Sequence, residues 1–273
     1  MTIRDFMRAL TALRPPRNEA RLLLAHVLHR DHAWLVAHDD YEFTTGELEQ
    51  INALTARRAA GEPVAYLLGE RDFYGRTFRC SPAALIPRPE TELLVERALA
   101  KFDINASLRV LDVGTGTGCI AITIALERPN AIVTAIDISP DALALARENA
   151  RRLHSNVAFI QSHWFATLPP NAQFDLILSN PPYIVPGDAH LNHGDLRFEP
   201  AVALADAVDG LESYRHLARG AQLHLKADGM LIVEHGYDQG ESVPALLSAA
   251  GFVDVTLRRD LAGHPRVTEA RKI

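Results

Sequence analysis

The stretch Val110-Leu-Asp-Val-Gly-Thr-Gly-Thr-Gly-Cys-Ile120 carries an apolar run directly into three glycines, at positions 114, 116 and 118. The apolar run predicts a buried strand over residues 109–113, and the residues from 119 onward predict a helix. Glycine lets the backbone turn sharply and approach a ligand without a Cβ in the way. The segment therefore predicts a strand–turn–helix unit at the carboxyl edge of an open α/β sheet, where such sheets bind ligands.

Strands and helices alternate on either side of this unit. Further candidate strands are residues 132–137, 157–160, 175–179 and 230–234, with helical patterns between most of them. Residues 252–257 and 266–271 are separated by a short turn and are expected to pair antiparallel at one edge. This alternation predicts an α/β fold, a doubly wound and mostly parallel seven-stranded sheet.

The first sixty residues have a helical pattern instead. Thr2 is expected to cap a first helix that Pro15 and Pro16 end, and Asn18 to cap a second. Thr44 and Glu47 have the spacing of a capping box before a further helix. We expect a small helical bundle over residues 1–70, a linker or hairpin over 71–89, and the sheet domain over 90–273.

Composition narrows the possible functions. The chain has 273 residues, 48% of them hydrophobic, and a net charge of −6. This content is too apolar for disorder, and the acidic balance disfavours non-specific binding to nucleic acid. Cys80 and Cys119 form no CxxC pair, so neither a disulfide framework nor a zinc site is expected. The beginning of the chain lacks the pattern of a signal peptide, and no apolar run could span a bilayer, so a cytoplasmic protein is expected.

The spacing of the glycine turn bears on the ligand. A dinucleotide fingerprint would place a glycine at 119, where this chain has Cys119, and no hydride-transfer residues are evident, which disfavours an NAD-dependent oxidoreductase. The G-x-G-x-G form, with Asp112 at the strand end, resembles the S-adenosylmethionine (SAM) loop of class I methyltransferases. Asp137, at the end of the next strand, could accept both hydroxyls of a ribose. The alternative is a tight turn with no ligand.

A second motif, Asn180-Pro-Pro-Tyr183, follows the candidate strand at 175–179 and so lies at the same sheet edge. Pro181 and Pro182 keep their carbonyl acceptors but have no N–H. Together with the Asn180 side-chain oxygen and the aromatic face of Tyr183, they could hold a planar –NH2 group. Fixed oxygen dipoles would stabilise the positive charge that such a nitrogen gains on attacking a methyl group. Considered alone, the motif could equally be a proline-rich turn.

Several segments together resemble the release factor glutamine methyltransferase family (PrmC/HemK). These segments are Phe73-Tyr-Gly75, Leu85-Ile-Pro-Arg-Pro-Glu-Thr-Glu92, Arg197-Phe-Glu-Pro200, Asp209-Gly-Leu211 and Glu234-x-Gly236-x-x-Gln239, besides the Asn-Pro-Pro-Tyr motif. Two positions depart from the family pattern. His163 stands where an acid is frequent, and Ala205-Asp-Ala207 stands where a glycine-rich turn is usual.

The resemblance implies an activity, namely methylation of the side-chain amide nitrogen (N5) of the glutamine in the Gly-Gly-Gln motif of class I peptide chain release factors. It implies SAM as the cofactor and the helical bundle as a contact to the release factor. The cofactor residues it implies are Asp112, Gly114, Thr115, Gly116, Thr117, Gly118, Asp137, Ile138, Trp164 and Asn180. Asn180, Pro181 and Tyr183 would be catalytic. The glutamine would be held by Asn180, Pro181, Pro182, Tyr183, Arg88 and Glu90.

Besides the oxidoreductase, two alternatives remain open. A DNA or RNA base methyltransferase would use the same Asn-Pro-Pro-Tyr motif, although a basic face and a DNA-reading module would then be expected. A non-catalytic, cofactor-stabilised interaction module would show no chemistry. A metal site could involve His190 and His193, close to Asp188 and Asp195. We interpret that segment as a polar loop over the pocket and expect no metal.

Overall fold

The computed structural model describes residues 1–10, 16–192, 194–206 and 208–273. The expected stop at Pro15 therefore lies outside the described residues, as do His193 and Ala207. The contacts divide the chain into two compact units, Met1–Glu70 and Arg71–Ile273. Within the described ranges, no helix combines the length and the apolar character needed to cross a bilayer.

The first unit is a bundle of short helices around a core that includes Leu23, Leu24 and Ile51, all fully buried. Its helices are α1 (Ile3–Ala9), α2 (Arg17–Leu28), α3 (His32–Ala37), α4 (Thr45–Ala59) and α5 (Val64–Leu68). The expected caps at Thr2 and Thr44 are confirmed, each as a capping box.

The cap predicted at Asn18 is wrong. Helix α2 starts at Arg17, after Pro16, whose φ of −54° already suits a helix, and its N-terminus has no side-chain cap. Helix α3, which Asp31 caps through its contact with the Trp34 N–H, was not expected. Its six residues are too few to show a helical period.

The second unit contains the sheet. Its strands are β1 (Glu70–Phe73), β2 (Arg76–Arg79), β3 (Arg109–Val113), β4 (Ile132–Asp137), β5 (Val157–Gln161), β6 (Phe174–Ser179), β7 (Leu225–Glu234), β8 (Val253–Arg259) and β9 (Pro265–Arg271). Its α-helices are α6 (Glu92–Leu99), α7 (Cys119–Glu127), α8 (Pro140–Arg152), α9 (Ala201–Leu204), α10 (Glu212–His224) and α11 (Ser242–Ala249). Short 3-10 helices are η1 (Pro89–Thr91), η2 (Ala189–Asn192), η3 (Gly194–Phe198) and η4 (Tyr237–Gln239).

Seven strands form one sheet in the order β5-β4-β3-β6-β7-β9-β8. The first five strands are parallel to one another, and β9 pairs antiparallel with both β7 and β8, which closes one edge as expected. The doubly wound, mostly parallel α/β sheet is therefore confirmed. Strands β1 and β2 form a separate hairpin, whose turn residues Tyr74 and Gly75 both have positive φ.

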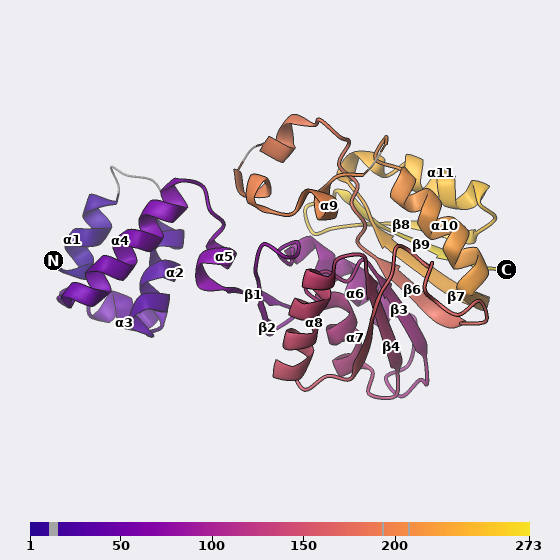
Figure 1. The fold of residues 1–273 in the computed structure, drawn as a ribbon, viewed down its shortest axis with the longest axis horizontal. Coiled ribbons are helices and arrows are strands. Elements are labelled where there is room, and N and C mark those ends of the chain that lie inside the picture. Colours follow the sequence, from indigo (N-terminus) through magenta and orange to yellow (C-terminus); the bar gives the residue numbers. More distant parts are fainter. Residues whose placement is uncertain (11–15, 193, 207) are drawn as a thin grey trace. The chain divides into compact units, whose positions relative to one another are not determined.

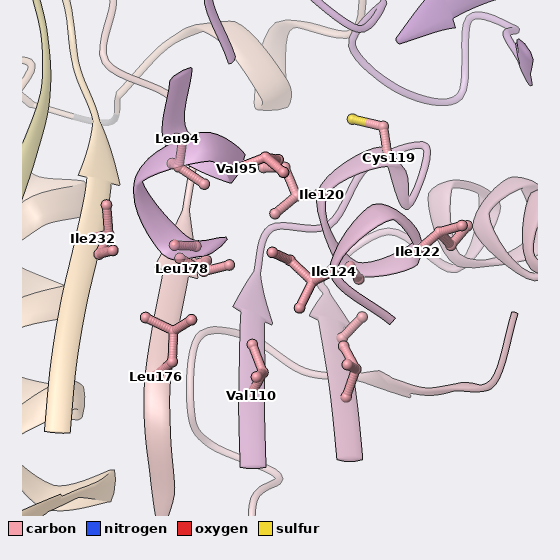
Figure 2. Close-up of a cluster of buried hydrophobic side chains, with 14 of the residues drawn as sticks. Leu94, Val95, Val110, Cys119, Ile120, Ile122, Ile124, Leu176, Leu178 and Ile232 are labelled. Carbon is pink, nitrogen blue, oxygen red and sulfur yellow. The ribbon is translucent and has the colours of Figure 1, made fainter. Parts of the chain in front are cut away.

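Helices cover both faces of the large sheet (Figure 1). On one face, α6 and α7 pack on side chains such as Val110, Leu176 and Ile232, and Figure 2 shows this cluster together with Cys119. On the other face, α10 and α11 bury Leu111, Ile177 and Val233, among others. Side chains alternate between the two faces along each strand, which explains why strands buried on both sides are largely apolar. Both cysteines are free and buried.

Candidate active site

The glycine turn joins β3 to α7 in a conformation that its three glycines permit. Gly114, Gly116 and Gly118 have φ of 75°, 56° and 82°, in the left-handed region. The N–H groups of Gly114 and Thr115 both donate to the Ile136 carbonyl of β4, at 2.9 and 3.0 Å. At Gly118 space is limiting as well, because a Cβ there would lie 2.9 Å from Ile122 Cδ1 and 3.1 Å from Ala146 Cβ.

Asp137, at the end of β4, lies directly against this turn. Its Oδ2 accepts the Gly116 N–H at 2.9 Å, and its Oδ1 accepts the Ser139 N–H at 2.9 Å. Partial burial raises its pKa, and these two backbone donors oppose the shift. A carboxylate has about four lone-pair positions, so two remain for ligand hydroxyls.

The glycine turn and the Asp137 carboxylate line a cavity of about 480 Å³, a size typical of small-molecule sites. Eleven of the residues predicted for the site line it, namely Arg88, Gly114, Thr115, Gly116, Thr117, Asp137, Ile138, Trp164, Asn180, Pro181 and Pro182. A Cβ built on Gly114 would meet no other atom within 4 Å. The backbone at the cavity wall can therefore be approached closely by a bound group.

Two predicted cofactor residues do not line this cavity. Asp112 lies beneath the turn, fully buried, where its Oδ2 accepts the Thr115 hydroxyl at 2.7 Å. Its other oxygen, Oδ1, has no hydrogen-bond partner among the described residues, and burial raises its pKa to about 7. Gly118 is also absent from the wall, because it packs on α7 and α8. These two residues shape the turn from below.

Asn180 follows β6, and its position is fixed from the neighbouring strand. The Ser179 hydroxyl donates to the Val113 carbonyl of β3 at 2.7 Å, so the two strand ends stay together. Asn180 Nδ2 donates to the Thr91 hydroxyl at 3.1 Å. The Pro182 carbonyl, expected as an acceptor for a ligand, instead accepts the Ser213 hydroxyl at 2.8 Å. Within the described part of the chain, Asn180 Oδ1 and the Pro181 carbonyl have no such donor.

A second cavity, of about 300 Å³, adjoins the motif, and the lining of both cavities includes Arg88. It contains the other two predicted substrate residues, Tyr183 and Glu90, with Asp195, Leu196, Glu234 and Arg266. Burial raises the pKa of Tyr183 to about 12, so its hydroxyl stays protonated at neutral pH. The four-residue motif thus extends from the first cavity to the second.

Trp164 also lines the first cavity. Its ring stacks on His216 of α10, with centroids 5.2 Å apart and planes 13° apart. His163, the residue before Trp164 in the sequence, also lines the first cavity. His216 was not predicted from the sequence. It lies 52 residues after Trp164, and its neighbours in the sequence do not indicate that it belongs to the same site.

Other contributors were missed for the same reason. Asn149 of α8 accepts the Arg79 N–H at 2.7 Å and donates to the Thr117 carbonyl at 2.9 Å, which ties the hairpin to the glycine turn. Asp206 accepts four backbone N–H groups, from Val208, Asp209, Gly210 and Ser213. These contacts fix the backbone of residues 208–210 and of Ser213 around Asp206.

The loop considered for a metal is only partly described. His193 lies outside the described residues, and the position of the His190 side chain is not described either. In the ranges that the structure covers, no three His, Cys, Asp or Glu side chains come together in a group that could hold a metal ion.

A sheet of this order, with a glycine turn and an acid at adjacent strand ends around one cavity, defines a class I methyltransferase domain, and the family model described as a methyltransferase domain matches residues 104–250. The PrmC N-terminal domain model matches residues 2–69. Proteins named release factor glutamine methyltransferase from Bordetella pertussis and Escherichia coli are 51% and 43% identical, over 93% and 98% of this chain and 94% and 97% of theirs. The chain belongs to the release factor glutamine methyltransferase family.

Solved structures agree on the fold. A methyltransferase from Pyrococcus furiosus is similar with a TM-score of 0.55 at 19% identity, over 81% of this chain and 98% of that one. A 16S rRNA N2 methyltransferase from T. thermophilus is similar with a TM-score of 0.57 at 18% identity, over 75% of this chain and 50% of that one. At such identities the likeness concerns the fold alone.

Proposed function

We propose that this chain transfers a methyl group from SAM to the side-chain amide nitrogen of the glutamine in the Gly-Gly-Gln motif of class I peptide chain release factors. One observation carries the proposal most directly. Asn180 and Pro181, with acceptor oxygens that have no donor among the described residues, line the same cavity as the glycine turn and Asp137. The names of the relatives support the choice of substrate.

The first cavity fits the cofactor. The backbone at Gly114 and Gly116 can be approached closely, the Asp137 carboxylate keeps acceptor capacity for a ribose, and Trp164 with His216 offers a flat aromatic wall for a base. When bound, SAM supplies an electrophilic methyl group on a sulfonium. We assign residues 114–117, Asp137, Ile138 and Trp164 to this cofactor, with Asp112 and Gly118 acting through the shape of the turn.

The substrate amide needs orientation and charge stabilisation. An amide nitrogen is a poor nucleophile because its lone pair is delocalised. Asn180 Oδ1 and the Pro181 carbonyl would accept its two N–H groups, hold the nitrogen in line and stabilise the positive charge it develops. No strong base is needed beforehand, because the nitrogen becomes acidic as the methyl arrives. Pro182 is a weaker candidate for direct contact, since Ser213 already occupies its carbonyl.

The second cavity would receive the peptide on either side of the glutamine. It is lined by charged and aromatic side chains, including Tyr183, Arg88 and Glu90. Glycine neighbours suit such a site, because they let a chain approach closely. We further propose that the unit Met1–Glu70 contributes to release factor binding. A release factor acts on the ribosome, so the cytoplasm is the proposed compartment.

Mass mapping of the reaction product tests the proposal. Release factor incubated with the protein and methyl-labelled SAM should gain one methyl group, located by fragmentation on the Gly-Gly-Gln glutamine. A release factor with that glutamine replaced by Ala is the matched control and should gain none. Label in added DNA or RNA alone would instead identify a base methyltransferase, and no label in any acceptor would indicate a non-catalytic module.

A further inference from the structure

A buried glutamate lies beside the Asn180 carboxamide. Glu234 is the last residue of β7, and the register pairs Ser179 of β6 with Val233, so the next residues of the two strands, Asn180 and Glu234, are neighbours. Glu234 is only 2% exposed. Its Oε2 has no hydrogen-bond partner among the described residues, although it is on the wall of the second cavity. A carboxylate in such a place is costly, which calls for a role.

Asn180 poses an orientation problem that this carboxylate can solve. A carboxamide has an oxygen end and an –NH2 end of nearly the same shape, and only the oxygen end can accept an N–H from a substrate amide. Asn180 Nδ2 donates to Thr91 Oγ1 at 3.1 Å, and Thr91 is itself buried. A hydroxyl, however, can donate as well as accept, so Thr91 alone would tolerate either orientation of the amide.

Glu234 removes this ambiguity when it is ionised. A carboxylate accepts hydrogen bonds and donates none, so the Thr91 hydroxyl beside it is favoured as the donor to Glu234. The Thr91 oxygen is then left to accept from Asn180 Nδ2. Asn180 also presents its –NH2 end on this side, where it donates to Thr91, and both Thr91 and Asn180 favour the charged form of Glu234.

We propose that Glu234 and Thr91 are positioning residues that hold the Asn180 –NH2 group inward, so that Asn180 Oδ1 is presented to the glutamine amide. The inference rests on the proposed function, because it concerns how the acceptor oxygen for that substrate is oriented. It adds two residues to the site, one from η1 and one from the end of β7, neither of which touches the reacting atoms.

Protonation of Glu234 should reverse the preference for the Asn180 orientation in which the –NH2 group points inward. Burial raises its pKa to about 7, the Glu90 charge adds to this rise, and Thr91, Arg266 and Asn180 oppose it. The other charged or titratable groups around it are Arg88, Tyr183 and Asp195 of the second cavity, and Tyr214, whose hydroxyl donates to the Glu234 carbonyl at 3.0 Å. A protonated Glu234 can donate, which allows Asn180 to turn its oxygen inward. Productive orientation should therefore be gained as pH rises through about 7.

Kinetics of the full chain with release factor provide the first test. Glu234→Gln should lower kcat about twofold at pH 8, because Gln can both donate and accept, so the two orientations become about equally populated. The rise of kcat between pH 6 and 8 should disappear in this variant, while the Kd for SAM stays within about twofold. Thr91→Val should lower kcat similarly, and Thr91→Ser should restore it. Glu148→Gln, an exposed change on α8, is the matched control.

A second readout does not depend on activity. In protein labelled with ¹⁵N-asparagine, the Asn180 side-chain –NH2 resonances, assigned with Asn180→Asp, should shift with pH near 7 in the wild type and in Glu148→Gln. They should stay constant in Glu234→Gln. If this shift occurs but no methyl reaches the glutamine, the proposed function fails, and what stands is that Glu234 controls the orientation of the Asn180 side chain. A different result would show that the positioning role is wrong. In that case the glutamine is methylated, the wild-type Asn180 resonances do not shift with pH, and Glu234→Gln keeps the wild-type kcat.

Discussion

The guanidinium of Arg88 pairs with the buried carboxylate of Glu199, 111 positions further along the chain. The other oxygen of Glu199 accepts the Ile86 N–H at 2.9 Å. Both partners belong to segments that resemble the family pattern, and Ile86 and Arg88 both line the first cavity. Arg88 lines the second cavity as well, so the pair links two distant segments beside the place where we propose that the peptide binds.

Glu199→Gln tests this link. The amide could still accept from Ile86 but would leave the Arg88 cation without its carboxylate. We expect the free energy of unfolding to fall by about 1–3 kcal/mol and kcat/KM for release factor to fall about tenfold, with SAM affinity unchanged. Denaturant unfolding and initial rates measure both effects. The double variant Arg88→Met/Glu199→Gln should lose less than the sum of the single variants, and strict additivity would show that the pair is not coupled.

Asn180→Ala should reduce turnover far more than cofactor binding. Its side-chain oxygen would stabilise charge that exists only near the transition state, so kcat should fall by about 10²–10³ while the Kd for SAM changes little. Single-turnover kinetics and calorimetry separate the two quantities. Asn171→Ala, at an exposed turn position, is the control and should be neutral. Turnover within a few-fold of wild type would mean that the amide dipole is not what activates the nitrogen.

Asp137→Asn should weaken the cofactor complex instead. The amide has one acceptor oxygen where the carboxylate has two, and its –NH2 group would face a backbone N–H that now donates to Asp137. We expect SAM to bind about 10–100-fold more weakly, and wild-type affinity to decrease as pH falls through the raised pKa of this carboxyl. Asp141→Asn, in the exposed first turn of α8, is the matched control. Equal affinities for the two variants would remove Asp137 from the ribose role.

The sequence predicted the strands and turns that depend only on residues close together in the chain. The apolar runs of β3 and β4 are buried on both faces, so their bounds could be predicted residue for residue. Strand β7 begins five residues earlier than predicted, because Asp228 and Gly229 interrupt its apolar run and the pairing with β6 shifts register there. No periodicity reveals such an irregularity.

The residues of the site can likewise be divided into those that the sequence predicted and those that it did not. Parallel neighbours end at one sheet edge, so the glycine turn, Asp137 and Asn180 could be expected together from strand order alone. The partners that hold them could not. Thr91 reaches Asn180 across 89 residues, and Asn149 reaches Arg79 across 70. Such contacts depend on how α6 and α8 pack on the sheet, which a single sequence does not specify.

The packing of α6 depends in part on a buried carboxylate. Glu269 of β9 is 1% exposed, and it accepts from Arg97 Nε at 2.5 Å, Lys101 Nζ at 2.7 Å and Arg258 Nε at 3.0 Å. Burial alone would raise its pKa, but the hydrogen bonds from these three cations lower it to about 2. Because the folded-state pKa lies below the unfolded value of about 4.3, the stabilisation is complete above that value and is lost as pH falls toward 2.

Glu269→Gln should therefore lower the free energy of unfolding of the second unit by about 2–3 kcal/mol at pH 7. The difference from wild type should shrink on acidification to pH 3, because wild-type Glu269 is then mostly protonated in the unfolded state but still mostly ionised in the folded state. A Trp34→Phe background leaves Trp164 as the fluorescence probe of this unit. Glu96→Gln, on the exposed side of the same helix α6, should change little at either pH. A destabilisation by Glu269→Gln that is equally large at pH 7 and pH 3 would show that packing, rather than the ionised carboxylate, holds α6 against the sheet.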